Sequence, residues 1–501
     1  MAESYHIAII GAGPAGLSAA GRAAHHDKES GANTPSYVLL EGFSTFAKTI
    51  QKYQKGKHVM DTPGFLDLRS PVPFVAGKRE DILGGWQNSI DTDSIHIRYN
   101  SEVTAIDGER GKFAIKTASG DTIGAEHIIM SIGTQGNPRT LGVPGDAESD
   151  FVMYTLDDPE EFQNETIVVV GAGDAAIENA IALAEYNKVY IVNRRNEFSR
   201  AKDGNLNAVL AAINDKGRDF HCFYETNIGG VELPGAPGEA GAIILNTATG
   251  EERVECHRII ARLGTLPPRK FVESCGIEIS SPSADAVPDV DNEYMSNVPG
   301  LYVIGALGGY PLIKQAMNQG YDVVEYIHGN HVEPVDTPIL KRKFQGLPIK
   351  MQPEEVLALY QSKIPMFRRM NPLAFRELII ESRILVGLEP PEFERTTQDD
   401  NEHATVFIKD GEPVYQHGEY STSFYTLVEG EVRMQLDEDG AWHDIKPGQF
   451  FGEMSLISGR PRQGSAIAER DCILIATPRR IMVKLMNSNE EVRAGIDRVF
   501  I

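Results

Sequence analysis

The sequence IAIIGAGPAGLSAA, residues 7–20, places three glycines between a short apolar strand and an alanine-rich helix. Gly11 permits a tight turn, Gly13 lets a pyrophosphate approach the backbone, and Gly16 lets the helix pack closely against the strand. The N-terminus of the helix would then face the phosphates, where its N–H groups favour negative charge. The stretch therefore predicts a dinucleotide-binding α/β domain at the start of the chain.

An acidic residue follows the glycine loop at the position that this fold requires. The next apolar strand, residues 37–41, ends on Glu41, whose carboxylate can accept hydrogen bonds from both hydroxyls of an adenosine ribose. The alternative is a glycine turn in an α/β domain that binds no ligand. The strand, the helix and the acid together favour a cofactor site.

The same pattern returns at residues 167–176, IVVVGAGDAA. Gly171 and Gly173 repeat the first two glycines, and Ala176 replaces the third, a substitution that the dinucleotide motif accepts. We therefore expect two dinucleotide sites, one in each of two Rossmann-like domains.

The strand at residues 188–193 indicates which nicotinamide dinucleotide to expect. It ends in Arg194 and Arg195, with Arg200 nearby. An acidic residue here would hold the ribose 2′-hydroxyl of NAD, whereas guanidinium groups can grip a 2′-phosphate in bidentate fashion. NADPH is therefore favoured over NADH, and solvated surface charges are the alternative interpretation of these arginines.

The composition is that of a folded chain with several domains. A length of 501 residues suggests about three domains, and 41% hydrophobic with 24% charged residues gives no sign of disorder. No apolar run reaches the roughly 20 residues that span a bilayer, so we expect a cytoplasmic protein without membrane contact. The formal net charge of −23 and the lack of a basic stripe argue against nucleic acid as a partner.

The cysteines do not form a recognisable redox or metal motif. Their spacing contains no C-x-x-C pair and suits no zinc site, so we expect no metal and no structural disulfide. His221 adjoins Cys222 and could lower the pKa of its thiol, but neighbouring residues on a strand point to opposite faces. A structural role is favoured for that pair, and no catalytic residue is assigned. The four cysteines are Cys222, Cys256, Cys275 and Cys472.

The sequence pattern changes after residue 332. The polar segment 333–351, with prolines at both ends of Glu333–Pro338, has the character of a linker. Residues 352–388 then show helical periodicity. From about residue 404, short strands separated by glycine turns predict a jelly-roll β-barrel, and helical patterning returns after Pro478.

Residues 451–465, FGEMSLISGRPRQGS, resemble the phosphate-binding cassette of cyclic-nucleotide-binding domains almost position for position. The resemblance implies that Glu453 accepts the ribose 2′-hydroxyl and that Arg462 pairs with the cyclic phosphate, since a guanidinium suits that anion. Gln463 stands where the family often has a small residue or a hydroxyl, so the choice between cAMP and cGMP stays open. The expected contacts are Gly452, Glu453, Met454, Ser455, Arg462, Gln463 and Ser465.

The two glycine motifs lie about 160 residues apart and are followed by a late strand, Gly300–Gly305. Residues 1–332 thereby resemble the two-dinucleotide-fold flavoprotein disulfide reductases, and their short length resembles thioredoxin reductase. In that family the NADPH-binding domain is inserted into the FAD-binding domain. The resemblance implies an FAD-binding domain at 1–150 and 288–332, an NADPH-binding domain at 151–287, a linker at 333–351 and a cyclic-nucleotide-binding domain at 352–501.

The same resemblance implies individual cofactor contacts. The helix that begins near Gln315 would point its N-terminus at the flavin pyrimidine, and a positive helix end there stabilises the anionic reduced flavin. The residues expected to contact FAD are Gly11, Gly13, Pro14, Ala15, Gly16, Glu41, Gly133, Gly305, Gln315 and Ala316. Those expected to contact NADPH are Gly171, Gly173, Asp174, Ala175, Arg194, Arg195 and Arg200.

Two departures from thioredoxin reductase affect the expected chemistry. That family carries a C-x-x-C pair just before the NADPH-binding strand, whereas residues 151–158 here contain no cysteine. The family also usually has Gly-Asp after the late strand to hold the ribityl chain of the flavin, and this sequence has Gly305-Ala306. Dithiol chemistry at 151–158 is therefore impossible, and the ribityl contact must be made differently.

We therefore expect an FAD-dependent oxidoreductase that takes hydride from NADPH and is regulated by a cyclic nucleotide. Its electrons would pass to a thioredoxin-like, ferredoxin-like or flavodoxin-like protein or to a small disulfide. The rival hypothesis is a signalling module that senses NADPH and cyclic nucleotide without reducing an acceptor. A homodimer is implied by the family resemblance alone, and the sign of regulation stays open.

Overall fold

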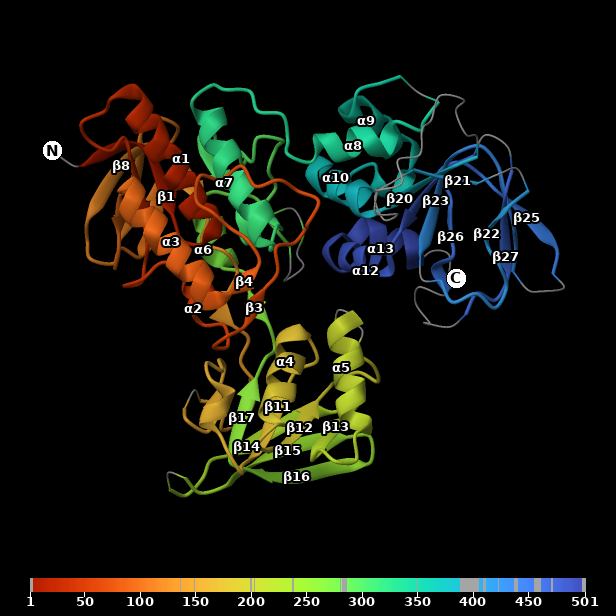
Figure 1. Ribbon diagram of the computed structural model, residues 1–501, viewed down its shortest axis with the longest axis horizontal. Helices are drawn as coiled ribbons and strands as arrows, with labels where there is room; N and C mark the ends of the chain where they lie inside the picture. The colour runs from red at the N-terminus through yellow and green to blue at the C-terminus, as the bar shows by residue number, and fades with distance from the viewer. Residues whose placement is uncertain are drawn as a thin grey trace. The chain divides into compact units, whose positions relative to one another are not determined.

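The structure of the protein is a computed structural model, and its chain forms two compact units. The first comprises residues 1–277 and 298–324, and the second comprises residues 278–297 and 325–501. Figure 1 colours the chain from red at the N-terminus to blue at the C-terminus. The structure describes residues 3–135, 137–147, 149–198, 201, 203–236, 238–279, 281, 286–348, 350–387, 405–408, 411–421, 423–436, 440–454, 461–469 and 472–497.

The first unit contains a seven-stranded sheet built around β1 (Ser4–Ile10), whose residues Ile7–Ile10 are buried. Five strands run parallel, and both faces of such a sheet are normally covered, which explains the continuous apolar run in β1. The parallel strands are β1, β2 (Tyr37–Leu40), β5 (Ile97–Arg98), β8 (Thr122–Met130) and β19 (Leu301–Val303). The antiparallel β7 (Phe113–Thr117) and β6 (Val103–Asp107) extend the sheet from the start of β8.

Three helices lie beside this sheet, namely α1 (Pro14–Ser30), α3 (Arg79–Asp93) and α7 (Ile313–Ile327) (Figure 1). Helix α1 touches α7 so closely that a Cβ at Gly320 would lie 2.3 Å from the carbonyl oxygen of Ala15. Only glycine permits that approach. The Ser18 hydroxyl donates to the Met317 carbonyl at 2.5 Å across the same contact. Shorter elements of this unit are α2 (Lys48–Gln51), β3 (His58–Val59), β4 (Gly77–Lys78) and α6 (Arg269–Ser274).

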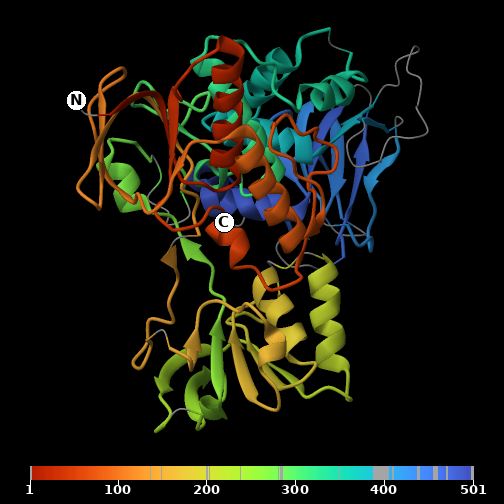
Figure 2. The same cartoon turned by 60° about the vertical axis from the view of Figure 1, so that its left-hand side comes forward.

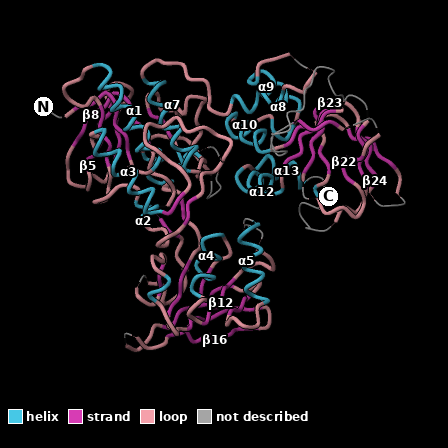
Figure 3. The backbone as a smooth tube through the Cα atoms, in the orientation of Figure 1, coloured by secondary structure: helices cyan, strands magenta, loops and turns pink. Residues whose placement is uncertain are grey.

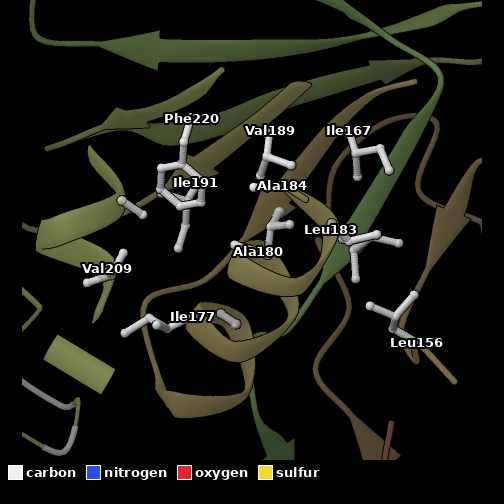
Figure 4. Close-up of a cluster of buried hydrophobic side chains, with 14 of the residues drawn as sticks. Leu156, Ile167, Ile177, Ala180, Leu183, Ala184, Val189, Ile191, Val209 and Phe220 are labelled. Atoms are coloured by element: carbon white, nitrogen blue, oxygen red, sulfur yellow. The ribbon is translucent and has the colours of Figure 1, made fainter. Parts of the chain in front are cut away.

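A second parallel sheet in the same unit follows the second glycine motif. Its strands, in spatial order, are β10 (Val152–Met153), β17 (Arg258–Ala261), β11 (Thr166–Val170), β12 (Lys188–Val192) and β13 (Phe220–Phe223). Helices α4 (Asp174–Leu183) and α5 (Asp203–Asn214) cover one face (Figure 2). Figure 4 shows the apolar core between these helices and the sheet, where Leu183 of α4 lies near Ile167 of β11 and Ala180 lies near Val189 of β12.

The other face of this sheet packs against a three-stranded antiparallel sheet. Val168 and Ile259 from the parallel strands share a buried cluster with Ile243 and Leu245 of the antiparallel sheet. Its strands are β14 (Asn227–Glu232), β15 (Gly241–Thr247) and β16 (Gly250–Cys256). A two-stranded ribbon of β9 (Asn137–Pro138) and β18 (Thr265–Leu266) completes the first unit.

The second unit contains two facing β-sheets, and its helices gather on one side of them (Figure 3). Leu427 and Leu474 from one sheet share a buried cluster with Val432 and Ala466 from the other, as expected for a jelly roll. The five-stranded sheet has β21 (Thr405–Phe407), β20 (Arg383–Val386), β28 (Ile473–Thr477), β23 (Phe424–Glu429) and β26 (Phe450–Phe451). The four-stranded sheet has β22 (Pro413–Tyr415), β27 (Ser465–Ala468), β24 (Val432–Gln435) and β25 (Trp442–Ile445). The predicted fold class, two Rossmann-like folds and a C-terminal jelly roll, is confirmed.

The helices of the second unit flank these sheets in the sequence. Those before the barrel are α8 (Thr337–Phe344), α9 (Pro353–Lys363) and α10 (Pro372–Glu381), and those after it are α12 (Arg479–Ser488) and α13 (Glu490–Asp497). Within the described residues, no helix combines the length and the hydropathy that a bilayer crossing requires.

Helix α8 lies inside the segment 333–351, which the sequence presents as a linker. A proline near its start contributed to that interpretation, yet proline is a normal residue in the first turn of a helix. Leu340 and Phe344 are buried, so the helix is packed rather than extended. The domain boundaries given above remain predictions.

Candidate functional site

The first glycine loop has the backbone geometry that a close phosphate contact needs. Gly11 adopts a φ of +98°, and a Cβ there would lie 2.9 Å from the Ser131 carbonyl oxygen. A Cβ on Gly16 would lie only 2.0 Å from the Gly11 carbonyl oxygen. Gly13 differs from both, because no atom lies within 4 Å of the position that its Cβ would occupy. The fold therefore requires glycine at two positions and leaves open space at the third.

Glu41 is buried at the end of β2 and held against this loop. Its Oε2 accepts from the Ala12 N–H at 2.8 Å, and its Oε1 accepts from the Phe43 N–H at 3.1 Å. Burial raises the pKa of Glu41, while those N–H groups and the nearby Lys48 act in the opposite direction. A carboxylate has about four lone-pair positions, so capacity remains for ribose hydroxyls.

Ser131 is a structural residue of the loop that sequence reasoning missed. Its buried hydroxyl lies 2.9 Å from the carbonyl oxygens of both Ile10 and Gly11, so it connects the end of β8 to the glycine turn. Two residues later Gly133 has a φ of +65° and nothing within 4 Å of its Cβ position. No short motif marks a serine at the end of a strand, so its role follows only from the pairing of β1 with β8.

The late strand β19 brings Gly305 to the same place. Gly305 has a φ of +70°, and a Cβ there would lie 3.1 Å from the Ala15 Cβ and 3.6 Å from the Ala316 Cβ. The buried Oε1 of Gln315, one residue before Ala316, has no hydrogen-bond partner in the part of the chain that the structure describes. Predicted contacts from α1, from the turn after β19 and from α7 therefore converge, with an unsatisfied acceptor among them. A bound polar cofactor fits this arrangement.

Buried polar residues at four-residue intervals on α7 hold the loop 61–69. Lys314 lies 2.7 Å from an Asp61 oxygen, and Asp322 pairs with Arg69 at 3.0 Å. Asn318 accepts from the Arg69 N–H at 2.8 Å and donates to the Asp67 carbonyl. Residues spaced by four share one face of a helix, so α7 fixes this loop along about two turns.

The second glycine loop repeats the geometry of the first. Gly171 has a φ of +135°, and a Cβ there would lie 2.4 Å from the Arg262 carbonyl oxygen. Gly173, like Gly13, has nothing within 4 Å of its Cβ position. Asp174 begins α4 and accepts from the Asn205 side chain at 2.8 Å, and the next residue, Ala175, is half-buried. The loop therefore has open space beside a helix N-terminus.

The predicted phosphate-binding arginines follow β12. Arg194 and Arg195 are exposed, and the buried Asn193 shapes the turn that carries them. The Asn193 Oδ1 accepts from the Arg195 N–H at 3.0 Å, and its Nδ2 donates to the Glu197 carbonyl at 3.0 Å. The turn thus places two guanidinium groups after the carboxyl end of a parallel strand, where such folds bind nucleotides. Arg200 lies outside the described residues.

Arg462, a predicted contact of the cyclic-nucleotide cassette, is buried, with 2% of its surface exposed. Its guanidinium donates to the Ser421 hydroxyl at 2.9 Å, to the Gly452 carbonyl at 2.8 Å and to the Ser423 carbonyl at 2.6 Å. Its carbon lies 4.2 Å from the centre of the Tyr415 ring, within cation–π range. Sequence reasoning identified Arg462 but not these partners.

The other predicted contacts of the cassette differ in burial and in their hydrogen bonds. Burial raises the pKa of Glu453, and the nearby Arg462 acts against that shift. Gly452 has a φ of +84°, a backbone conformation that favours glycine, and a Cβ there would lie 2.7 Å from an Arg462 nitrogen. Ser465 accepts from the His417 N–H at 3.0 Å. Met454 and Gln463 are exposed, and Ser455 lies outside the described residues.

The four cysteines form no disulfide within the described residues, and the surroundings of three of them disfavour the thiolate. Burial raises the pKa of Cys222 and of Cys256 to about 12, and that of Cys275 to about 11. A nucleophilic cysteine needs the opposite shift. His221 pairs with Asp219 at 2.7 Å. Among the described residues, no group of three or more His, Cys, Asp or Glu side chains could hold a metal ion.

Two protein families match this chain. The family described as pyridine nucleotide-disulphide oxidoreductase matches residues 8–305, and the cyclic nucleotide-binding domain matches residues 405–489. A ferredoxin--NADP reductase of Ignicoccus hospitalis is 27% identical over 318 residues, covering 62% of this chain and 93% of the relative. A ferredoxin--NADP reductase of Lactiplantibacillus plantarum is 27% identical over 311 residues, which cover 61% of this chain and 86% of the relative.

Solved structures agree with the fold of the first unit. The bacillithiol disulfide reductase Bdr (YpdA) of Staphylococcus aureus has a TM-score of 0.57 at 19% identity, covering 65% of this chain and 99% of its own. The thioredoxin reductase of Lactococcus lactis has a TM-score of 0.52 at 21% identity, and the match covers 65% of this chain and 98% of that structure. At these identities the likeness shows the fold alone.

Proposed function

Because the chain belongs to the pyridine nucleotide-disulphide oxidoreductase family and carries a C-terminal cyclic nucleotide-binding domain, we propose that it is an NADPH-dependent FAD oxidoreductase regulated by a cyclic nucleotide. It is an oxidoreductase of the ferredoxin-NADP and thioredoxin reductase type. One observation carries the proposal: a Cβ would collide with the backbone at Gly11, Gly16 and Gly171, whereas Gly13 and Gly173 border open space, each beside a helix N-terminus.

The residues of the first site would bind and orient the flavin nucleotide. When bound, FAD supplies the chemistry that accepts hydride and releases electrons to an acceptor. Glu41 would accept hydrogen bonds from the adenosine ribose, and the N-terminus of α1 would face the pyrophosphate. Gln315, whose buried Oε1 lacks a partner among the described residues, would complete its hydrogen bonds with the cofactor.

The second site would bind NADPH through Gly171, Gly173 and the start of α4. Arg194 and Arg195 would take the 2′-phosphate, because exposed guanidinium groups after β12 can form charge-assisted hydrogen bonds with it. The turn organised by Asn193 would hold them in place.

Electrons would leave the flavin directly for an external acceptor. Residues 151–158 contain no cysteine, and burial raises the pKa of three of the four thiols in the chain. A dithiol relay inside the chain therefore has no support. The names of the curated relatives favour a ferredoxin-like acceptor over a thioredoxin-like protein or a small disulfide. A flavodoxin-like protein is the second small redox protein that we propose to test.

An acceptor screen tests this assignment. The purified full-length chain is reduced with NADPH, and its reoxidation is followed with a ferredoxin, a flavodoxin, a thioredoxin and a small disulfide. We expect rapid turnover with one of the first two. Turnover with none of the four, in a protein whose flavin is reduced by NADPH, would contradict the electron-transfer part of the proposal and favour a signalling role. Size-exclusion chromatography with light scattering tests the proposed homodimer.

A further inference from the structure

The turn after β19 lacks a side chain that the flavin site would need. Residue 306 is alanine, so no acid follows Gly305 to contact the ribityl chain of the flavin. The ribityl chain carries hydroxyl groups, and a buried hydroxyl without a partner is costly. If FAD binds as proposed, another residue near Gly305 must supply hydrogen bonds.

Gln319 of α7 is the polar side chain that reaches this turn. It is 4% exposed, and its Oε1 accepts from the Gly305 N–H at 2.8 Å. That donor defines which end of the amide is oxygen, so the amide nitrogen is turned away from the Gly305 N–H. Neither N–H of Nε2 has a partner among the described residues. An enclosed side chain therefore holds the turn with one end and keeps two donors available.

Its neighbours are the other predicted flavin contacts. Gln315 lies one helical turn earlier on α7, and residues four apart share a face of the helix. The Cβ position of Gly305 lies 3.6 Å from the Cβ of Ala316, and Gly320 packs against Ala15 of α1. Gln319 thus lies where the turn after β19, the start of α1 and α7 meet.

We propose that Gln319 positions the ribityl chain of FAD in place of the missing acid. Its Oε1 fixes the Gly305 turn, and its Nε2 donates to a ribityl hydroxyl. A neutral amide makes this contact without adding a negative charge beside the flavin, in contrast to an aspartate. The inference rests on the proposed function, because it requires that the first site holds FAD.

The test measures the FAD dissociation constant of the full-length chain after its flavin has been removed and titrated back. Gln319→Met keeps the length and volume of the side chain but removes its hydrogen bonds. We expect about tenfold weaker FAD binding, the effect of one lost hydrogen bond with its partner left buried. Gln319→Ala serves as a second variant should methionine pack poorly.

Asn187→Ala is the matched control. Asn187 is a buried amide just before β12, and its Nδ2 donates to the Phe162 and Leu183 carbonyls while its Oδ1 accepts from the Glu165 N–H. Its loss should lower thermal stability and leave the FAD dissociation constant unchanged. A general loss of buried hydrogen bonding is thereby separated from a loss at the flavin site.

A double variant distinguishes ribityl contact from support of the turn. Ala306→Asp restores the acid without restoring the bond to the Gly305 N–H, so adding it to Gln319→Met should recover most of the lost affinity. Unchanged affinity in Gln319→Met, or no recovery in the double variant, would overturn the ribityl role. A wild-type chain that binds no FAD would instead refute the proposed function, since the control and the variants would then not differ.

Discussion

Arg462 joins parts of the barrel to one another as well as being the predicted phosphate contact. A guanidinium has five N–H donors, and those of Arg462 reach Ser421, Ser423 and Gly452. Two N–H groups remain without a partner within the described residues, enough for one bidentate contact with a phosphate. The Tyr415 and Tyr425 rings hold the guanidinium in this orientation.

Arg462→Ala should therefore abolish binding of cAMP and cGMP and also lower the melting temperature of the barrel. The lost hydrogen bonds link a charged group to buried carbonyls, and each such bond contributes about 1.5–3 kcal/mol. Calorimetry with both nucleotides and a thermal scan measure the two effects. Arg433→Ala is the control, because Arg433 is an exposed arginine of the same barrel that pairs with Glu469. Normal nucleotide binding by Arg462→Ala would show that its role has been misassigned.

Replacing both Arg194 and Arg195 with alanine should weaken NADPH binding roughly 10- to 100-fold and leave NADH binding nearly unchanged, since only NADPH carries the 2′-phosphate. Flavin reduction rates at increasing concentrations of each dinucleotide measure the two affinities. Arg218→Ala, an exposed arginine that pairs with Asp215, should change neither. Equal losses for both dinucleotides would refute the phosphate assignment.

At the scale of elements, the strand–loop–helix units separate glycines that the fold needs from glycines that a ligand needs. Gly16 contacts the backbone of the loop itself, whereas Gly13 borders open space. In the second loop, Gly171 lies against backbone and Gly173 borders open space.

Gly13→Ala should consequently fold normally but lose FAD, because its methyl group would occupy the space reserved for the pyrophosphate. Gly16→Ala should be unstable, since its Cβ would lie 2.0 Å from the Gly11 carbonyl oxygen. Circular dichroism melting and flavin content distinguish the two variants. A Gly13→Ala protein with full flavin content would show that this loop does not bind the cofactor.

Helix α8 is joined to α10 by Lys343, whose Nζ donates to the Ile379 and Ile380 carbonyls at 2.9 and 2.6 Å and also to the Ser382 carbonyl. Burial lowers the pKa of Lys343 to about 7, and Glu381 acts against that shift. The unfolded chain then binds more protons than the folded chain between pH 7 and the ordinary lysine pKa of about 10.4, so the free energy of unfolding rises with pH in that range.

We expect the wild type to gain melting temperature relative to Lys343→Met as the pH is raised from 7 to 8.5. The variant cannot titrate at this position, so the difference between the two proteins isolates Lys343. Lys341→Met, an exposed lysine on the same helix that pairs with Glu333, should show no such difference from wild type. A constant gap between wild type and Lys343→Met across this range would refute the lowered pKa.

At the scale of the whole molecule, the sequence predicted contacts within short segments better than contacts between distant ones. The glycine loops, Glu41 and Arg462 lie in local patterns, and the structure places each of them at the end of a strand or within a loop. Ser131 and Gln319 reach these places only through the pairing of β8 and the packing of α7, so no local pattern marks them. In the segment 333–351 a local pattern was misleading, since its prolines suggested a linker where α8 forms.

The proposed regulation by a cyclic nucleotide is likewise a property of the whole molecule. A ligand at Arg462 can change flavin reduction only if two conformations of the chain bind it with different affinity. If the cyclic nucleotide changes the affinity for NADP⁺ by some factor, NADP⁺ must change the affinity for the cyclic nucleotide by the same factor, which calorimetry with and without NADP⁺ can detect.

Anaerobic titration of the purified full-length chain with NADPH tests whether it is an NADPH-dependent flavoprotein reductase. We expect a yellow protein whose oxidised-flavin absorbance is lost after one equivalent of NADPH per flavin, with NADH reacting far more weakly. A colourless protein that takes up no FAD, or a bound flavin that NADPH leaves oxidised, would contradict it.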